Sequence, residues 1–184
     1  MRSHGPWTIH QTRDVYRDAW IDVTLDAVTR PDGKPGSYTT VRLKSGVCVI
    51  ALDDRQQVHL TREFHYAVGR ITIEGVSGGI EVGESPELAA QRELAEELGL
   101  TATSWKRLGQ VDPFTSAILS TVDLYLAQDL SDCPTAPEGT EQIEHVVLSL
   151  AEAVEMVRQS QITHAPTCVA LLHIALDHTG WLAK

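Results

Sequence analysis

The sequence predicts an α/β protein in which a mixed β-sheet is covered by helices on its faces and is preceded by an N-terminal β-hairpin. Two observations predict this class. Short runs rich in β-branched residues alternate along the chain with segments of helical periodicity. Extended segments near the N-terminus flank a turn rich in Pro and Gly. At 184 residues with 42% hydrophobic side chains, the chain can bury a core without disulfides.

The N-terminal hairpin is predicted from two extended segments, residues 20–29 and 38–43. Between them, residues 31–36 read Pro-Asp-Gly-Lys-Pro-Gly, which is typical of a tight reversal. We therefore expect residues 1–45 to form an N-terminal β-hairpin extension and residues 46–184 to form the main domain.

Strands of the main domain are expected where apolar runs or apolar–polar alternation occur. Residues 47–52 form a β-branched run that reads as a buried strand, and residues 58–62 read as the strand after it. Further strands are expected at residues 71–73, 106–111 and 120–127, whereas residues 131–140 contain two prolines and a glycine and are expected to form a loop.

Three helices are expected. The first begins after Ser85, a favoured N-cap, has Pro86 at its first position and ends at Gly99. Residues 150–159 and 166–177 show helical spacing of apolar side chains and predict the other two. The histidines in this half of the chain lack metal-site spacing, so we expect them at the surface.

Composition excludes several classes of function. The chain has 15 Lys and Arg against 25 Asp and Glu, a net charge of −10, and no basic run, which argues against partners such as nucleic acid or a membrane surface. The three cysteines are far apart, which indicates reduced thiols rather than a disulfide framework. No signal sequence or apolar run of about 20 residues is present, so we expect a cytoplasmic protein.

The first helix concentrates negative charge on one face. Glu93 and Glu97 are four residues apart, and Glu96 lies beside them, although like charges at this spacing destabilise a helix. A glycine-rich turn precedes this helix; it contains Gly78, Gly79 and Gly83 together with Glu81 and Glu84. Clustered carboxylates with a nearby backbone carbonyl suit a hard divalent cation that also binds phosphates. The alternative is a solvated acidic face balanced by Arg92.

The spacing of the whole stretch decides between these interpretations. It reads Gly, five residues, Glu, seven residues, Arg-Glu, an aliphatic residue, any residue, Glu-Glu, any residue, Gly and an aliphatic residue. This pattern resembles the Nudix box, and the chain fills every specified position of it: Gly78, Glu84, Arg92, Glu93, Leu94, Glu96, Glu97, Gly99 and Leu100.

The resemblance implies a Nudix-type α/β/α sandwich and metal-dependent hydrolysis of a nucleoside diphosphate linked to a further moiety. It implies that Glu93, Glu97 and the Ser77 carbonyl bind Mg²⁺ or Mn²⁺. Glu96 is implied to be a further ligand or a catalytic partner of the metal, and Arg92 is implied to orient the carboxylates.

Weaker similarity points to the ADP-ribose pyrophosphatase branch. Residues 60–70 resemble the segment in which an arginine reaches the substrate's phosphates, and Arg62 is the matching residue; a surface ion pair is the alternative. Gly75 and Val76 stand where Leu and Pro are usual, and His65 stands where a second arginine is common. These departures leave open ADP-ribose or a related nucleoside diphosphate sugar as the substrate.

The segments after the box extend this resemblance. Residues 112–116 resemble the loop that lines the terminal ribose, which makes Pro113 a substrate-binding candidate. Residues 138–147 resemble the loop that supplies a catalytic glutamate. Glu141 matches by position and Glu144 is the fallback. A solvated acidic loop is the alternative.

In the same branch the N-terminal segment crosses to a second subunit and helps to bind the base. The resemblance therefore implies a homodimer in which residues 1–45 dimerise the protein or bind a nucleobase. Trp20 and Tyr16 could stack on a purine, although a tryptophan at a strand start is more often part of the core. Two other functions remain open at this point. One is a nucleoside triphosphate house-cleaning pyrophosphatase, and the other is a non-catalytic sensor of nucleotide sugars.

Overall fold

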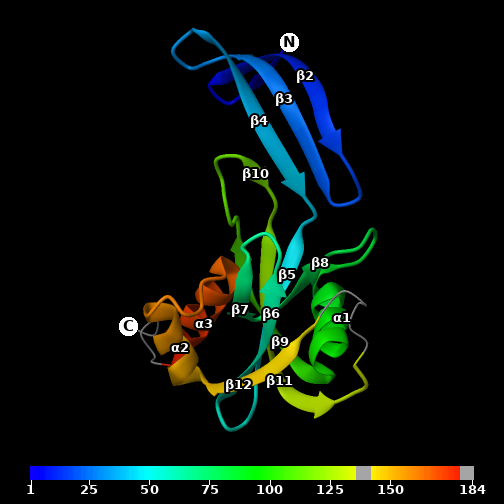
Figure 1. The fold of residues 1–184 in the computed structure, drawn as a ribbon, viewed down its shortest axis with the longest axis vertical. Coiled ribbons are helices and arrows are strands. Elements are labelled where there is room, and N and C mark those ends of the chain that lie inside the picture. The colour runs from blue at the N-terminus through cyan, green and yellow to red at the C-terminus, as the bar shows by residue number, and fades with distance from the viewer. Residues whose placement is uncertain (136–141, 179–184) are drawn as a thin grey trace. The chain divides into compact units, whose positions relative to one another are not determined.

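The chain consists of two compact units (Figure 1). The structure, a computed structural model, describes residues 1–135 and 142–178. The first unit comprises residues 1–45 and 112–121, and the second comprises residues 46–111 together with the chain from residue 122 onward. Residues 112–121 therefore belong to the unit built by the N-terminus and not, as expected from the sequence, to the main domain.

The first unit is a five-stranded sheet rather than a single hairpin. The predicted hairpin is confirmed at its centre, where β3 and β4 pair antiparallel and Gly33, with a φ of +80°, lies in the turn. β1 and β2 extend this sheet on one side, and β10 pairs with β4 in parallel on the other. The strands are β1 (Arg2–His4), β2 (Trp7–Arg17), β3 (Ile21–Thr29), β4 (Pro35–Leu43) and β10 (Ile118–Leu119).

The second unit is built around a mixed sheet in the order β12-β6-β5-β11-β9, with β7 paired to β6 and β8 paired to β5. β11 runs parallel to β5 and antiparallel to β9, which confirms the predicted mixed sheet. The strands are β5 (Gly46–Leu52), β6 (Gln57–His65), β7 (Arg70–Glu74), β8 (Val76–Gly79), β9 (Leu100–Val111), β11 (Val122–Asp132) and β12 (Glu144–Ser149).

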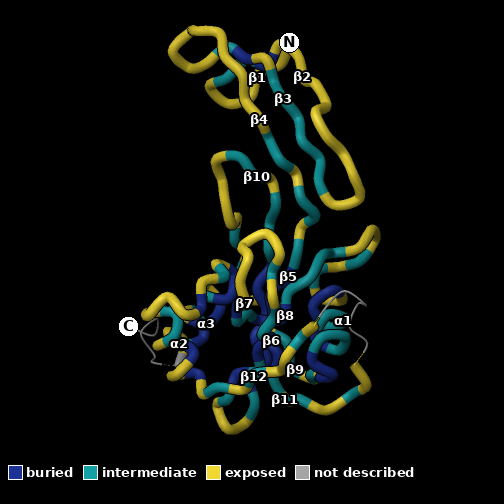
Figure 2. The backbone as a smooth tube through the Cα atoms, in the orientation of Figure 1, coloured by how far each residue is buried: buried dark blue, intermediate teal, exposed yellow. Residues whose placement is uncertain are grey.

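Helices cover both faces of this sheet (Figure 1). β5 supplies side chains to both layers. Cys48, Ile50 and Leu52 point to the layer that contains α2 (Leu150–Arg158) and α3 (Ala165–His178). The alternate side chains of β5 pack instead with α1 (Pro86–Leu98), as the two-residue period of a strand requires. The buried residues of the second unit are dark blue in Figure 2.

Local capping explains the limits of α1. The Ser85 hydroxyl accepts a hydrogen bond from the Leu88 amide at 3.2 Å, and Gly99 ends the helix with a φ of +63°. Both predicted ends are confirmed, and so are the two C-terminal helices. No helix in the described part of the chain is long and apolar enough to cross a membrane.

Three expectations about secondary structure were wrong. Gly78 and Gly79 belong to strand β8 and not to a turn, because β5 provides a hydrogen-bonding partner for this glycine-rich segment. β9 begins at Leu100, and residues 131–132 are still in β11, because these two strands pair along almost their whole length. β1 and β2 were missed because β2 is mostly exposed and lacks apolar alternation.

Candidate active site

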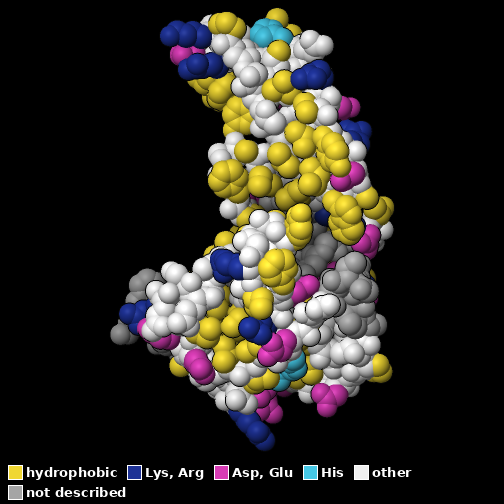
Figure 3. Space-filling view, in the orientation of Figure 1, with side chains coloured by type: hydrophobic (Ala, Val, Ile, Leu, Met, Phe, Trp, Pro, Cys, Tyr) yellow, Lys and Arg dark blue, Asp and Glu magenta, His cyan; other side chains and the backbone are white. Residues whose placement is uncertain are grey.

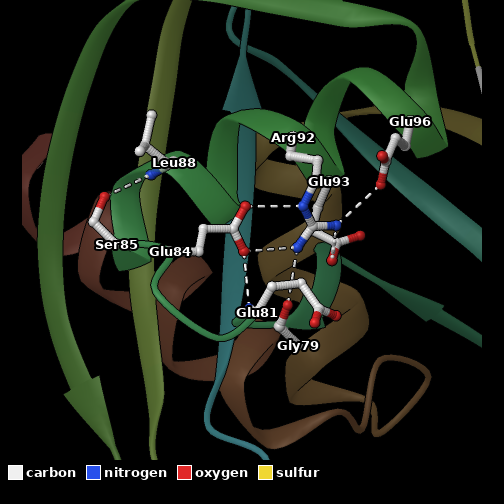
Figure 4. Close-up of polar contacts among 8 residues, drawn as sticks. All are labelled: Gly79, Glu81, Glu84, Ser85, Leu88, Arg92, Glu93 and Glu96. Atoms are coloured by element: carbon white, nitrogen blue, oxygen red, sulfur yellow. Dashed lines mark hydrogen bonds and ion pairs between the residues drawn. The ribbon is translucent and has the colours of Figure 1, made fainter.

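Arg92 on α1 is the centre of the acidic cluster (Figure 4). Its Nη1 donates to the carboxylates of Glu93 at 2.7 Å and Glu96 at 3.0 Å. Its Nη2 donates to the carbonyl oxygen of Gly79 in β8 at 2.9 Å. A single guanidinium thus balances neighbouring carboxylates that would otherwise repel each other on one helix face.

Glu84 binds Arg92 from the turn before the helix. Arg92 Nε lies 2.9 Å from one carboxylate oxygen and Nη2 lies 3.1 Å from the other, which is bidentate geometry. These hydrogen bonds lower the pKa of Glu84 and raise that of Arg92, so both groups stay charged at neutral pH. The Glu84 carboxylate also accepts from the Glu81 amide at 2.9 Å, which closes the turn.

Gly78 leaves room for the carboxylate of Glu93. A Cβ atom at Gly78 would lie 1.9 Å from the Glu93 Cδ atom, so only glycine permits this close approach. The Glu93 side chain is 13% exposed. β8 and α1 therefore enclose one of the predicted metal ligands.

Glu97 lies one turn further along α1, on the same side as Glu93. Burial raises the pKa of the Cys48 thiol to about 11, and the negative charges of Glu74 and Glu97 contribute to this increase. Ser77 pairs with Cys48 across the β5–β8 ladder. The predicted ligands Ser77, Glu93 and Glu97 thus come from two adjacent elements of the second unit.

The residues present fit a hard divalent metal by donor chemistry. All the candidate donors are carboxylate or carbonyl oxygens, which Mg²⁺ and Mn²⁺ prefer. The space at Gly78 accommodates one of these carboxylates next to the backbone of β8. Within residues 1–135 and 142–178, however, no three acidic, histidine or cysteine side chains already surround a common point, because Glu93 and Glu96 both turn to Arg92.

Arg62 and Glu144, both predicted site residues, contact each other. They are directly opposite on β6 and β12, and Arg62 Nη1 lies 2.5 Å from a Glu144 carboxylate oxygen. Both line a small cavity of about 280 Å³ whose other walls include Phe64, Ile71 and Gln142. Glu141, the preferred candidate for the general base, lies outside the described residues.

Trp20 and Pro113 both belong to the first unit. Trp20 is 64% exposed, and the ammonium of Lys44 lies 5.1 Å from the centre of its ring. It is therefore not a core residue, which was the alternative considered for it. Pro113 lies in the exposed segment before β10.

A larger cavity of about 820 Å³ lies within the first unit. Trp7 and Tyr38 line it with their rings in an edge-to-face contact, 5.4 Å between centroids. Trp20 and Pro113 do not line it, whereas residues 115–119 do. This cavity could not be predicted from the sequence, because part of its wall comes from β1, β2 and residues 115–119, and neither these two strands nor the place of residues 115–119 in this unit was expected.

Comparisons with known proteins decide the family. Residues 42–167 match the NUDIX domain family, and residues 7–41 match the nucleoside diphosphate sugar hydrolase N-terminal domain. The chain belongs to the Nudix family. This confirms the family prediction made from Gly78 to Leu100.

Two of the curated relatives that cover most of the chain are ADP-ribose pyrophosphatases. An ADP-ribose pyrophosphatase of Bacillus subtilis is 29% identical over 85% of this chain and 85% of its own length. An ADP-ribose pyrophosphatase of Mycobacterium tuberculosis is 28% identical over 98% of this chain and 88% of its own length. The solved structure of an ADP compounds hydrolase matches with a TM-score of 0.83 and 23% identity over 98% of this chain and 99% of that one, which confirms the predicted Nudix-type fold.

His65, which stands where the ADP-ribose pyrophosphatase branch commonly has a second arginine, lies close to an acidic residue. His65 Nε2, at the end of β6, lies 3.2 Å from the carboxylate of Glu74, at the end of β7. His164, at the start of α3, lies 3.2 Å from the same carboxylate. The side chain of His164 is only 26% exposed, so the expectation of a surface histidine was wrong there. Sequence spacing could not reveal this cluster because its members come from distant segments.

Proposed function

We propose that this Nudix protein hydrolyses the diphosphate bond of ADP-ribose or a related nucleoside diphosphate sugar, which yields a nucleoside monophosphate and a sugar phosphate. One observation carries the proposal. Arg92 binds three of the box carboxylates, Glu84, Glu93 and Glu96, and Glu93 lies against the open backbone of Gly78. A diphosphate with its metal ions requires this kind of preorganised anionic surface.

In this proposal, Glu93, Glu97 and the Ser77 carbonyl hold Mg²⁺ or Mn²⁺, with Glu96 as a further ligand or a partner beside them. A bound divalent metal would neutralise the diphosphate and make a water molecule easier to deprotonate. Arg92 keeps the carboxylates oriented through four hydrogen-bonded partners, Glu84, Glu93, Glu96 and the Gly79 carbonyl.

Arg62 binds the substrate's phosphates in the proposed reaction. It must first leave Glu144, which it contacts in this structure. The two side chains are 42% and 62% exposed, and an ion pair this exposed contributes at most about 1 kcal/mol, so a phosphate group can replace Glu144. We assign the proton-accepting role to Glu141, with Glu144 as the alternative.

The remaining candidate substrate-binding residues, Trp20 and Pro113, belong to the first unit. The exposed ring of Trp20 is available to stack on the base, and the Pro113 segment is proposed to contact the terminal ribose. Large hydrophobic side chains are exposed on this unit (Figure 3), including Val15, Tyr16 and Tyr38. Exposed apolar surface of this kind supports a homodimer. The free thiols of Cys48, Cys133 and Cys168 support a cytoplasmic location.

A substrate screen tests the proposed reaction. The purified full chain is incubated with ADP-ribose, GDP-mannose, UDP-glucose and nucleoside triphosphates, each with Mg²⁺, Mn²⁺ or EDTA, and products are separated by anion-exchange chromatography. We expect metal-dependent release of nucleoside monophosphate from a diphosphate sugar. Release of pyrophosphate from triphosphates would favour a house-cleaning enzyme. Tight binding without any product in either metal would favour a sensor.

A further inference from the structure

Gly75 lies where the chain passes from one strand pairing to another. β7 pairs with β6 and ends at Glu74, whereas β8 pairs with β5 and begins at Val76. A Cβ atom at Gly75 would lie 2.8 Å from the carbonyl oxygen of Val49 and 3.1 Å from the Cys48 sulfur. The backbone therefore runs close against β5 at this point, and only glycine fits.

The amide of Gly75 is buried and is bound by a side chain from α3. It donates a 2.8 Å hydrogen bond to the hydroxyl of Thr167, which is fully buried in the first turn of that helix. The same hydroxyl lies 2.8 Å from His164 Nδ1 and 3.7 Å from the Cys48 sulfur. A buried amide without such a partner is costly, so the hydroxyl fixes the crossing between β7 and β8.

This crossing leads directly into the proposed metal site. The Ser77 hydroxyl donates to the Gly75 carbonyl oxygen at 2.8 Å, which ties the two residues together. Gly78, the next residue, lies against the carboxylate of Glu93. The path from α3 to the site therefore runs through a few hydrogen-bonded or touching residues, although α3 and α1 pack on opposite faces of the sheet.

We propose that Thr167 is a positioning residue for the reaction. Its hydroxyl holds the Gly75–Gly78 backbone in the position in which the Ser77 carbonyl and the Glu93 carboxylate could both bind one metal ion. This inference rests on the proposed function. It assigns to α3, which contributes no residue to the Nudix box, a part in the geometry of the site.

The test compares Thr167→Val, which keeps the shape but removes the hydroxyl, with Thr167→Ser, which keeps the hydroxyl. We expect Thr167→Val to lower kcat by about 10-fold or more, since displacements of about 1 Å have effects of this order, with little change in KM. We expect it to weaken Mn²⁺ binding measured by electron paramagnetic resonance and to remove the hydrogen-exchange protection of the Gly75 amide. Thr167→Ser should restore all three towards wild type.

Two control variants separate positioning from a loss of stability. Thr163→Val removes a hydroxyl from the exposed residue that binds Arg70 just before α3. Ile174→Val loosens the buried face of the same helix without touching Gly75. Neither should change kcat or Mn²⁺ affinity, even where the melting temperature falls.

The outcomes distinguish this inference from the proposed function. Wild-type kcat and Mn²⁺ affinity in Thr167→Val, or equal losses in Thr167→Ser, would overturn the role of the hydroxyl while leaving the hydrolase activity in place. If the wild-type chain hydrolysed no diphosphate sugar but its Mn²⁺ affinity still depended on the Thr167 hydroxyl, only the proposed reaction would be contradicted. A wild-type chain that binds no Mn²⁺ would contradict both.

Discussion

Arg92 and Glu84 form a bidentate ion pair that joins α1 to the turn before it, with 2.9 Å between Nε and Oε1 and 3.1 Å between Nη2 and Oε2. The two residues are eight positions apart in the sequence. The same guanidinium binds Glu93, so a contact outside the reacting groups determines where a proposed metal ligand points.

Replacing Arg92 with Lys should destabilise the protein. Lysine cannot reproduce the planar, multiply bonded guanidinium, so we expect the free energy of unfolding to fall by about 1–3 kcal/mol. For a chain of this size that corresponds to a decrease of about 2–4 °C in Tm per kcal/mol, measurable by calorimetry. Arg158→Lys, in an exposed ion pair with Glu155, is the matched control and should shift Tm little.

The Arg92 effect should depend on pH in a defined direction. Because Arg92 lowers the pKa of Glu84 in the folded state, this pair stabilises the fold fully above the ordinary carboxyl pKa, about 4.3. The stabilisation is lost as the pH falls through the lower folded-state pKa. The difference between wild type and Arg92→Lys should therefore shrink under acid. A difference that grows with acid would contradict this assignment.

Glu93→Gln and Glu97→Gln should each lower kcat by orders of magnitude, because an amide is a poor replacement for a carboxylate ligand of a hard cation. Circular dichroism should show an unchanged fold. Glu87→Gln, an exposed position in the first turn of the same helix, is the control and should keep the wild-type rate. Wild-type turnover in either ligand variant would refute its assigned role.

Gly78→Ala should inactivate the enzyme without removing any charged group. The new methyl group would overlap the Glu93 carboxylate, which must then turn away. We expect weaker Mn²⁺ binding in calorimetric titration. Gly36→Ala, which lies in the first unit and whose methyl group would come closest to the flexible Arg30 side chain, should bind Mn²⁺ normally. Equal metal affinity in both variants would show that the space at Gly78 is not required.

Glu141→Gln and Glu144→Gln should separate the two candidates for the general base. Loss of the base lowers kcat while metal binding is retained. We expect this result for Glu141→Gln. Glu144→Gln removes the partner of Arg62 and should lower KM or leave it unchanged, with kcat preserved. The reverse pattern in steady-state kinetics would transfer the role to Glu144.

Cys48 should be unreactive in the folded protein. Burial raises the pKa of its thiol to about 11, so almost no thiolate is present at pH 8. Alkylation with iodoacetamide followed by mass spectrometry should label Cys48 only after unfolding. The raised pKa stabilises the fold fully below about pH 8.5, and this contribution is lost as the pH rises towards 11. Cys48→Ala should reduce that alkaline loss in urea titrations.

Much of the second unit could be predicted from local sequence patterns. The ends of α1 follow from Ser85, Pro86 and Gly99, each of which acts on its own backbone or on the adjacent turn. The β-branched run at residues 47–52 predicted the central strand. β8 could not be predicted in this way, because glycines have little strand propensity and form a strand here only since β5 pairs with them.

In the candidate site, too, local spacing predicted some features, whereas contacts between distant segments could not be predicted. The spacing of the box predicted which carboxylates lie together on α1, because residues three or four apart always share a helix face. It could not predict that Arg62 contacts Glu144 or that His164 reaches Glu74, since these pairs meet only through strand register and helix packing.

The sequence by itself determined the Nudix family and the chemistry of the acidic helix, because both depend on residue types at fixed short spacings. Only the tertiary structure decided that Gly78 makes room for Glu93, that residues 112–121 join the N-terminal unit, and that Thr167 binds the Gly75 amide. Each of these contacts joins segments that are distant in sequence. Such contacts depend on how the strands and helices pack, which no short window of residues encodes.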